Sequence, residues 1–156
     1  MISVSERRRY IPIGYVDSSV IASNKIYIIP EATLYLFGIL TSGVHMAWMR
    51  IVCRRLEMRY GYSPAVYNNF PFPDATDEQK ASVEKLAQGI LDARLLFPQN
   101  TLADLYDPLT MPPELLKAHK ELDRAVMKLY GFPKDAAEPA IVAALMERYQ
   151  KLANKQ

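Results

Sequence analysis

A carboxylate and a guanidinium, those of Glu57 and Arg59, lie two residues apart in a stretch where apolar and polar residues alternate. The alternation predicts a strand over residues 56–62, because successive side chains of a strand point to opposite faces. One face would be buried and consists of Leu56, Met58 and Tyr60. The other face carries Glu57, Arg59 and Gly61. There the glutamate can accept a hydrogen bond from N4 of cytosine while the arginine bridges O6 and N7 of guanine, which would read both members of a C·G base pair.

The same two residues also fit an ordinary ion pair on a half-exposed strand, and exposed ion pairs are common and weak. The distribution of charge favours contact with a polyanion. Residues 1–73 carry eight Lys and Arg against four Asp and Glu, whereas residues 74–156 carry eleven against thirteen. Arg and Tyr, which suit phosphates and base edges, are concentrated in the first half. The second half has the scattered Lys and Glu of a solvated helical surface.

Four basic residues of the first half are candidates for binding DNA phosphates: Lys25, Arg50, Arg54 and Arg55. The three arginines fall at the predicted C-terminal end of a helix, where positive charge also complements the helix dipole. The sequence therefore leaves two roles open for them, one in DNA binding and one in the stability of that helix.

Motifs for catalysis are absent from the sequence. It contains no G-x-G-x-x-G, no P-loop, no G-x-S-x-G and no paired-histidine zinc motif. With Cys53 as the single cysteine and only His45 and His119, we expect neither a disulfide framework nor a structural zinc site. Both histidines fall on apolar helical faces, which predicts core positions. Glu6 and three arginines occupy the positions where a secretory signal would have its apolar core, so we expect a cytoplasmic protein. From the absent motifs we also expect no catalytic, metal-binding or cofactor-binding residues in this chain.

The first half of the chain predicts short strands around a buried helix pair. Residues 8–16 read as an irregular or edge strand, and residues 25–29 as a strand that Pro30 ends. A helix is expected from Glu31, with a break between residues 38 and 43 and a second helix that ends near Val52. The apolar run 32–52 holds a central histidine and a nearby arginine, which are costly in lipid, so a buried helix pair is favoured over a membrane span.

The second half predicts helices. Residues 67–73 are an aromatic, proline-bracketed linker, and Thr76 with Gln79 forms a capping-box signature that opens a helix to about Phe97. A second long helix would follow Pro112 and stop at Gly131, and a third would begin near Asp135. The predicted fold class is therefore α+β, with a small irregular sheet and a buried helix pair in residues 1–73 and a three-helix bundle in residues 74–156.

Several segments together resemble the C-terminal part of large single-chain DNA adenine methyltransferases, the type IIL (type IIG-like) restriction–modification enzymes and their methylase-only relatives. In the first half these segments are Ile39-Leu40-Thr41-Ser42 followed by His45-Met46-Ala47-Trp48, Cys53-x-Arg55-Leu56, and the Tyr-Asn-Asn-Phe-Pro-Phe-Pro of residues 67–73. In the second half they are Leu105-Tyr106-Asp107, Met111-Pro112, His119-x-x-Leu122-Asp123 and Tyr130-Gly131. The resemblance covers nearly the whole chain.

The resemblance implies a division of labour. Residues 1–73 would be the distal part of a target-recognition domain, and residues 74–156 a helical domain that closes around double-stranded DNA. The methyl donor SAM and the methylation motif would belong to a methyltransferase domain upstream in the same parent chain. Glu57 and Arg59 are similar to the position that reads the base pair beside the target adenine, with C on the methylated strand. Arg54 stands where a glycine is usual and Gly61 where an arginine is common, which changes the expected phosphate contacts.

Two other functions fit parts of the sequence. The chain could be a helical protein-interaction or assembly module in which the arginines are structural and DNA is not touched. It could also be a stand-alone enzyme, although it lacks the motifs that such an enzyme would need.

Overall fold

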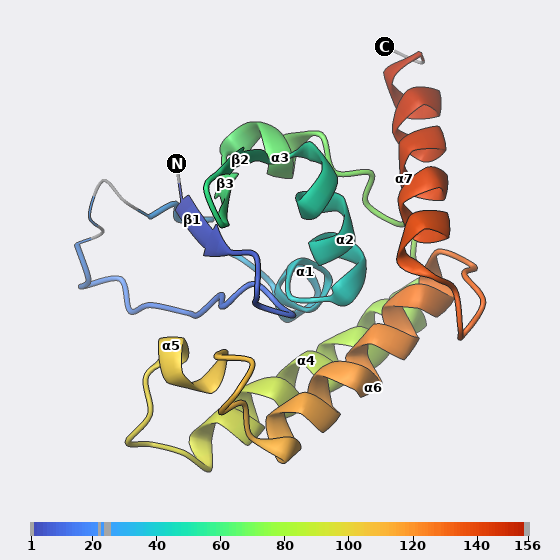
Figure 1. Ribbon diagram of the computed structural model, residues 1–156. Helices are drawn as coiled ribbons and strands as arrows, with labels where there is room; N and C mark the ends of the chain where they lie inside the picture. Colours follow the sequence, from blue (N-terminus) through green and yellow to red (C-terminus); the bar gives the residue numbers. More distant parts are fainter. Residues whose placement is uncertain (1, 22, 24–25, 155–156) are drawn as a thin grey trace.

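The structure is a computed structural model that describes residues 2–21, 23 and 26–154. In this part of the chain, three short strands and the helix pair of the first half lie beside the long helices of the second half (Figure 1). One continuous hydrophobic cluster runs from Val4 near the N-terminus to Leu145 near the C-terminus. The α+β class predicted from the sequence is confirmed.

The sheet is antiparallel and has the order β1-β3-β2. Its strands are β1 (Ile2–Ser5), β2 (Arg54–Leu56) and β3 (Arg59–Tyr62). β3 is central and pairs with β1 from Ile2↔Tyr62 to Ser5↔Arg59. Strand β1 was not predicted, because a four-residue segment has too little alternation to indicate a strand and its partner lies more than fifty residues away.

The buried helix pair is confirmed. Helix α1 (Leu34–Leu40) begins after Thr33, whose side chain accepts from the backbone N–H of Leu36. Helix α2 (Gly43–Val52) begins after Ser42, whose hydroxyl caps it in the same way, so the predicted break lies at Thr41 and Ser42. α1 starts three residues later than predicted, because Glu31 has a φ of 52° and interrupts helical geometry. Among the described residues, no helix has the length and apolar character needed to span a membrane.

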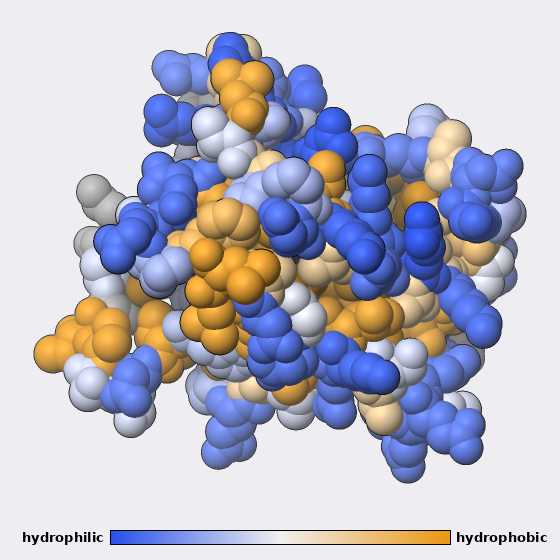
Figure 2. Space-filling model, turned by 90° about the horizontal axis from the view of Figure 1, so that it is seen from below, coloured by the Kyte–Doolittle hydropathy of each residue, from blue (hydrophilic) through white to orange (hydrophobic). Residues whose placement is uncertain are grey.

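The segment between β1 and α1 has no regular structure in its described residues. The irregular or edge strand predicted for residues 8–16 is therefore wrong, because this stretch pairs with no other strand. The strand predicted for residues 25–29 is wrong for residues 26–29, and Lys25 lies outside the described residues. Ile26 and Ile28 are 45% and 50% exposed, so the apolar β-branched side chains that suggested a strand have no sheet to join. Figure 2 shows apolar side chains in several patches on the face seen from below.

The second half contains the three long helices that were predicted. They are α4 (Asp77–Leu95), α6 (Pro113–Leu129) and α7 (Glu138–Ala153), with the short helices α3 (Pro64–Asn68) before them and α5 (Leu102–Leu105) between α4 and α6. The capping box of Thr76 and Gln79 is present at the start of α4. Gly131 has the predicted left-handed conformation, with a φ of 70°, two residues after α6 ends.

The packing of these helices places the sheet on one side of the molecule. α4 and α6 lie antiparallel and side by side, and α1 packs on α4, so α1 and α2 lie between the sheet and the α4–α6 pair (Figure 1). α7 turns away from α6 and packs against α2, where the rings of Trp48 and Tyr149 are 5.8 Å apart. The aromatic linker is packed as predicted, since Phe70 is buried against the rings of His45, Trp48 and Phe72.

Candidate nucleic-acid interface

The residues predicted to read DNA lie in a β-hairpin, which is β2, β3 and the two residues between them (residues 54–62, the reader hairpin below). Leu56 pairs with Arg59, so Glu57 and Met58 form the connection. Glu57 has a φ of 55°, a conformation that two-residue hairpin turns need and that Gly, Asn and Asp adopt most readily. The turn is held by Glu6, whose N–H donates to the carbonyl of Met58 over 3.1 Å.

The single strand predicted for residues 56–62 is therefore wrong, because the chain reverses at Glu57. The alternation holds only for the first two residues of β3, where Arg59 is exposed and Tyr60 is buried. Met58, predicted to be buried, is 53% exposed because it lies at the tip of the turn. Gly61, predicted on the exposed face, is buried. It lies in the central strand, between Ser3 of β1 and Arg54 of β2.

Glu57 and Arg59 remain open to a ligand. Both are exposed, one in the turn and the other at the first position of β3. Neither makes an ion pair or a side-chain hydrogen bond with another residue that the structure describes. A carboxylate and a guanidinium at the tip of a hairpin can both reach an edge of a base pair without breaking an internal contact.

Arg54 and Arg55 belong to β2, not to the end of α2 where they were predicted. Arg55 lies opposite Tyr60, donates to the Tyr60 hydroxyl over 3.1 Å and stands 5.4 Å from the centre of its ring. Its side chain is still 67% exposed and lies 4.0 Å from a carboxylate oxygen of Glu6. Arg54 is exposed at the rim of a groove whose walls include Trp48 and Tyr149. Both guanidinium groups are accessible, and that of Arg55 is pre-oriented by the tyrosine.

Arg50 has different surroundings from these two. It lies in the last turn of α2, as predicted, and its Nη1 forms an ion pair with Glu138, the first residue of α7. Its Nη2 donates to the backbone carbonyl of Arg8 over 3.5 Å. The side chain is 26% exposed. The structure thus brings Arg54, Arg55, Glu57 and Arg59 together in the reader hairpin and directs Arg50 toward the helical half.

The two histidines occupy the core positions that were predicted. His45 and His119 are fully buried, and their Nε2 atoms lie 2.9 Å from the Tyr62 hydroxyl and 2.7 Å from the Tyr106 hydroxyl. Burial lowers the pKa of each imidazole to about 3, so both are neutral near neutral pH. In the described part of the chain no three His, Cys, Asp or Glu side chains converge as metal ligands would. These histidines are packing residues of the core.

Comparison with known families agrees with the resemblance seen in the sequence. Residues 2–74 match the model of the MmeI target recognition domain, and residues 75–155 match the model of the MmeI C-terminal domain. The chain belongs to the MmeI family. It contains a target recognition domain and a C-terminal domain of this family of DNA methyltransferases and restriction–modification enzymes.

Two relatives illustrate the extent of the similarity. The chain is 40% identical over 152 residues to DNA methyltransferase A of Bacillus subtilis (strain 168), which covers 97% of this chain and 17% of the relative. It also superimposes on the structure of the type IIL restriction–modification enzyme MmeI in complex with DNA, with a TM-score of 0.94 and 49% identity, over 98% of this chain and 21% of that one. The chain thus spans about a fifth of the length of these relatives.

A buried polar network that was not predicted from the sequence joins the two parts of this MmeI-family chain. Asp123 of α6 accepts from the hydroxyl of Tyr10 and from the N–H of Gly43, each over 2.7 Å. The Tyr10 ring stacks on His119 at 4.0 Å, and Arg94 donates to the carbonyl of Ile13 over 2.7 Å. The only sequence signal was Asp123 within an apolar helical face, and its partners lie 80 and 113 residues away.

Proposed function

We propose that this chain recognises the sequence of double-stranded DNA as part of a larger SAM-dependent N6-adenine DNA methyltransferase. The observation that carries the proposal is the match, at 49% identity over 98% of the chain, to an enzyme whose structure was solved in complex with DNA. The exposed, unpaired state of Glu57 and Arg59 supports the same function, because base readers must keep their hydrogen-bonding groups free for the duplex.

The reader hairpin supplies the base contacts in this proposal. Glu57 accepts a hydrogen bond from N4 of cytosine, and Arg59 donates to O6 and N7 of the paired guanine. Arg54 and Arg55, exposed on the adjoining strand, contact phosphates and fix the hairpin on the duplex. Each well-formed base contact would contribute about 1–3 kcal/mol of discrimination against a wrong base pair.

The remaining parts of the reaction lie elsewhere in the parent protein. A methyltransferase domain upstream in the same polypeptide would bind SAM, which donates the methyl group, and would hold the target adenine. Residues 74–156 would close on the duplex beside the recognition part and act as a clamp. This chain would then supply sequence recognition and DNA binding, but no catalytic group.

An exchange of the two reader charges tests the proposal. The region can replace the corresponding fifth of a methyltransferase relative, and the methylated adenines can then be mapped in genomic DNA. Glu57→Lys combined with Arg59→Asp should change one base pair of the methylated site from C·G to G·C, because lysine can donate to guanine and aspartate can accept from cytosine. A control with the same exchange of charge, Glu147→Lys with Lys151→Asp, lies on an exposed ion pair of α7 and should leave the site unchanged. Unchanged methylation sites in the hairpin variant would refute the base-reading roles.

A second function, a protein-interaction module, is supported by a separate observation. Tyr15, Ile21 and Ile28 are 49%, 96% and 50% exposed in the irregular segment, where apolar side chains suit a protein partner. A stable homodimer with no affinity for duplex DNA at low salt would favour this function over DNA recognition.

A further inference from the structure

The position of the reader hairpin depends on helix α2. Only Cys53 separates the end of α2 at Val52 from the start of β2 at Arg54. Cys53 is buried, and its N–H closes the last turn of the helix by donating to the carbonyl of Met49 over 3.0 Å. A shift or rotation of α2 would therefore move the hairpin with it.

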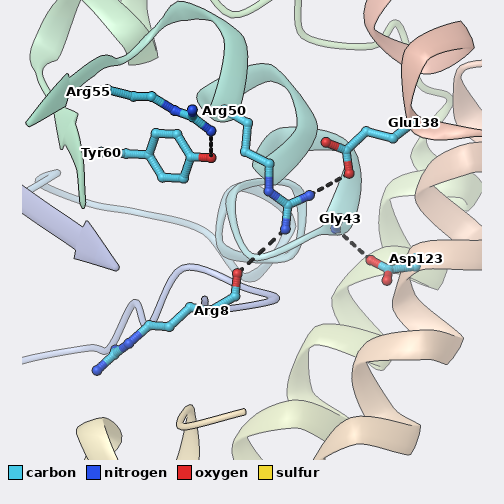
Figure 3. Close-up of polar contacts among 7 residues, drawn as sticks. All are labelled: Arg8, Gly43, Arg50, Arg55, Tyr60, Asp123 and Glu138. Atoms are coloured by element: carbon cyan, nitrogen blue, oxygen red, sulfur yellow. Dashed lines mark hydrogen bonds and ion pairs between the residues drawn. The ribbon is translucent and has the colours of Figure 1, made fainter. Parts of the chain in front are cut away.

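Both ends of α2 are held by carboxylates from the second half of the chain (Figure 3). At the N-terminal end, Asp123 of α6 accepts from the N–H of Gly43 over 2.7 Å, which satisfies one of the free donors of the first turn. At the C-terminal end, Glu138 of α7 pairs with Arg50. The helical half thus contacts both ends of α2, the helix that leads into the reader hairpin.

The guanidinium of Arg50 faces the interior of this arrangement. Figure 3 shows it between Glu138 and the backbone carbonyl of Arg8, while the Arg55 side chain lies beside Tyr60. A DNA phosphate at Arg50 would have to displace the carboxylate of Glu138. Arg55 also has a carboxylate oxygen nearby, that of Glu6 at 4.0 Å, but its side chain is 67% exposed against 26% for Arg50 and is therefore more open to a phosphate.

We propose that Arg50 is a positioning residue, whose ion pair with Glu138 fixes the end of α2 on α7 and so sets how the reader hairpin is presented to DNA. The ion pair itself is a feature of the structure, whereas its effect on DNA binding rests on the proposed DNA-recognition function. It assigns the C-terminal helical half a second task beyond clamping, which is to orient the base readers. It also separates Arg50 from Arg54 and Arg55, although all three were candidates for phosphate binding.

The chain contains a natural probe for this contact. Trp48 is the only tryptophan of the sequence, lies in the middle of α2, and is 2% exposed. Its ring lies 5.8 Å from that of Tyr149 in α7. Quenching of its fluorescence by acrylamide therefore reports how closely α7 covers α2, without any DNA.

The experiment reverses the ion pair in the full 156-residue chain. Arg50→Glu and Glu138→Arg alone should each increase the quenching of Trp48, and each should weaken binding to a pool of random-sequence duplexes by about two- to fivefold, as expected for loss of a partly exposed ion pair. The double variant, with the charges exchanged, should recover both properties. Glu147→Arg is the matched control, because it makes the same charge change on α7 at an exposed pair with Lys151 and should leave Trp48 quenching unchanged.

Two results would overturn the proposal. If Arg50 contacts a phosphate, the double variant will bind DNA as weakly as Arg50→Glu, and the slope of log affinity against log salt will fall by about 1. If neither single variant changes the quenching of Trp48, the ion pair does not hold α2. Should Arg50→Glu fail to fold, Glu138→Gln gives the same quenching measurement, because it removes the partner charge at a side chain that is 46% exposed. Failure of the parent chain to bind any duplex would refute the proposed function, and the quenching experiment would still decide the role of Arg50.

Discussion

The two histidines of the chain are neutral groups buried in the core, and their burial predicts a fold that is sensitive to mild acid. His45 and His119 have a pKa of about 3 in the folded protein, mainly because burial disfavours the charged imidazole. In an unfolded chain the pKa of histidine is about 6.5. The unfolded state therefore binds more protons than the folded state between these values. The stabilisation is complete above the unfolded pKa and is lost as the pH falls toward the folded one.

We predict that the free energy of unfolding falls by about 2 kcal/mol per histidine between about pH 7 and about pH 5. Asp123 has the opposite effect, because burial raises its pKa. Its contribution to the free energy of unfolding is lost as the pH rises through its pKa in the folded state. It therefore offsets part of the change. Urea unfolding at a series of pH values measures the slope, and His45→Gln should reduce it if the variant folds. A free energy of unfolding that does not change over this range would show that the imidazoles titrate normally.

The reader hairpin shows which features of single residues can be predicted from the sequence alone. The exposure of Glu57 and Arg59 followed from alternation in the sequence, and the structure has both exposed. The turn at Glu57 and Met58 could not be predicted from this alternation, because Glu-Met lacks the Asn-Gly or Asp-Gly signature of two-residue hairpins. The Arg50 partner could not be predicted either, since Glu138 lies 88 residues away and only the packing of α7 on α2 brings it close.

At the scale of elements, helices were predicted well and strands poorly. Helix signals are local, such as the Thr76 and Gln79 capping box or the left-handed Gly131 after α6. Strand signals depend on a partner. β1 exists because β3 pairs with it, whereas the isoleucine-rich residues 26–29 remain irregular with no strand beside them. The direction of α7 was also set by tertiary contacts, because its apolar face meets α2.

The contact between α1 and α4 makes a specific prediction about two glycines. A Cβ on Gly38 in α1 would lie 2.7 Å from Cγ1 of Val83 and 3.3 Å from Cβ of Ala87, both in α4. Gly38→Ala should therefore destabilise the fold by about 1–3 kcal/mol through overpacking, despite the better helix propensity of alanine. Chemical denaturation of the variant and of the parent chain measures the difference.

Gly89 provides the matched control, because it also lies in a long helix but a Cβ there would meet no atom within 4 Å. Gly89→Ala should raise the free energy of unfolding by about 0.5–1 kcal/mol, through helix propensity alone. Opposite signs for the same substitution would confirm that α1 and α4 approach closely at Gly38. Stabilisation by both would mean that this helix contact is looser than the structure has it.

At the scale of the whole molecule, charge and packing are distributed unequally. The first half has the excess of arginine, and the sheet, which holds Arg54, Arg55 and Arg59, lies on the side of α1 and α2 away from α4 and α6 (Figure 1). The buried network of Asp123, Tyr10 and Arg94 connects the N-terminal segment with α4 and α6. The reader hairpin, which would bind the duplex, is thus part of a fold whose two halves are joined by buried polar contacts.

The unequal distribution of arginine predicts which residues make the affinity for DNA depend on salt concentration. Each phosphate contact that is lost lowers the slope of log affinity against log salt by about 0.9. Arg54→Gln and Arg55→Gln should each produce this change and weaken binding to all sequences alike, because both arginines are exposed on the reader hairpin. Arg124→Gln removes the same charge from the exposed face of α6, at a distance from the sheet, and should leave the slope as it is. Fluorescence anisotropy with a labelled duplex over a salt series measures all three. An equal change for Arg124→Gln would show that the phosphate contacts are not concentrated on the reader hairpin.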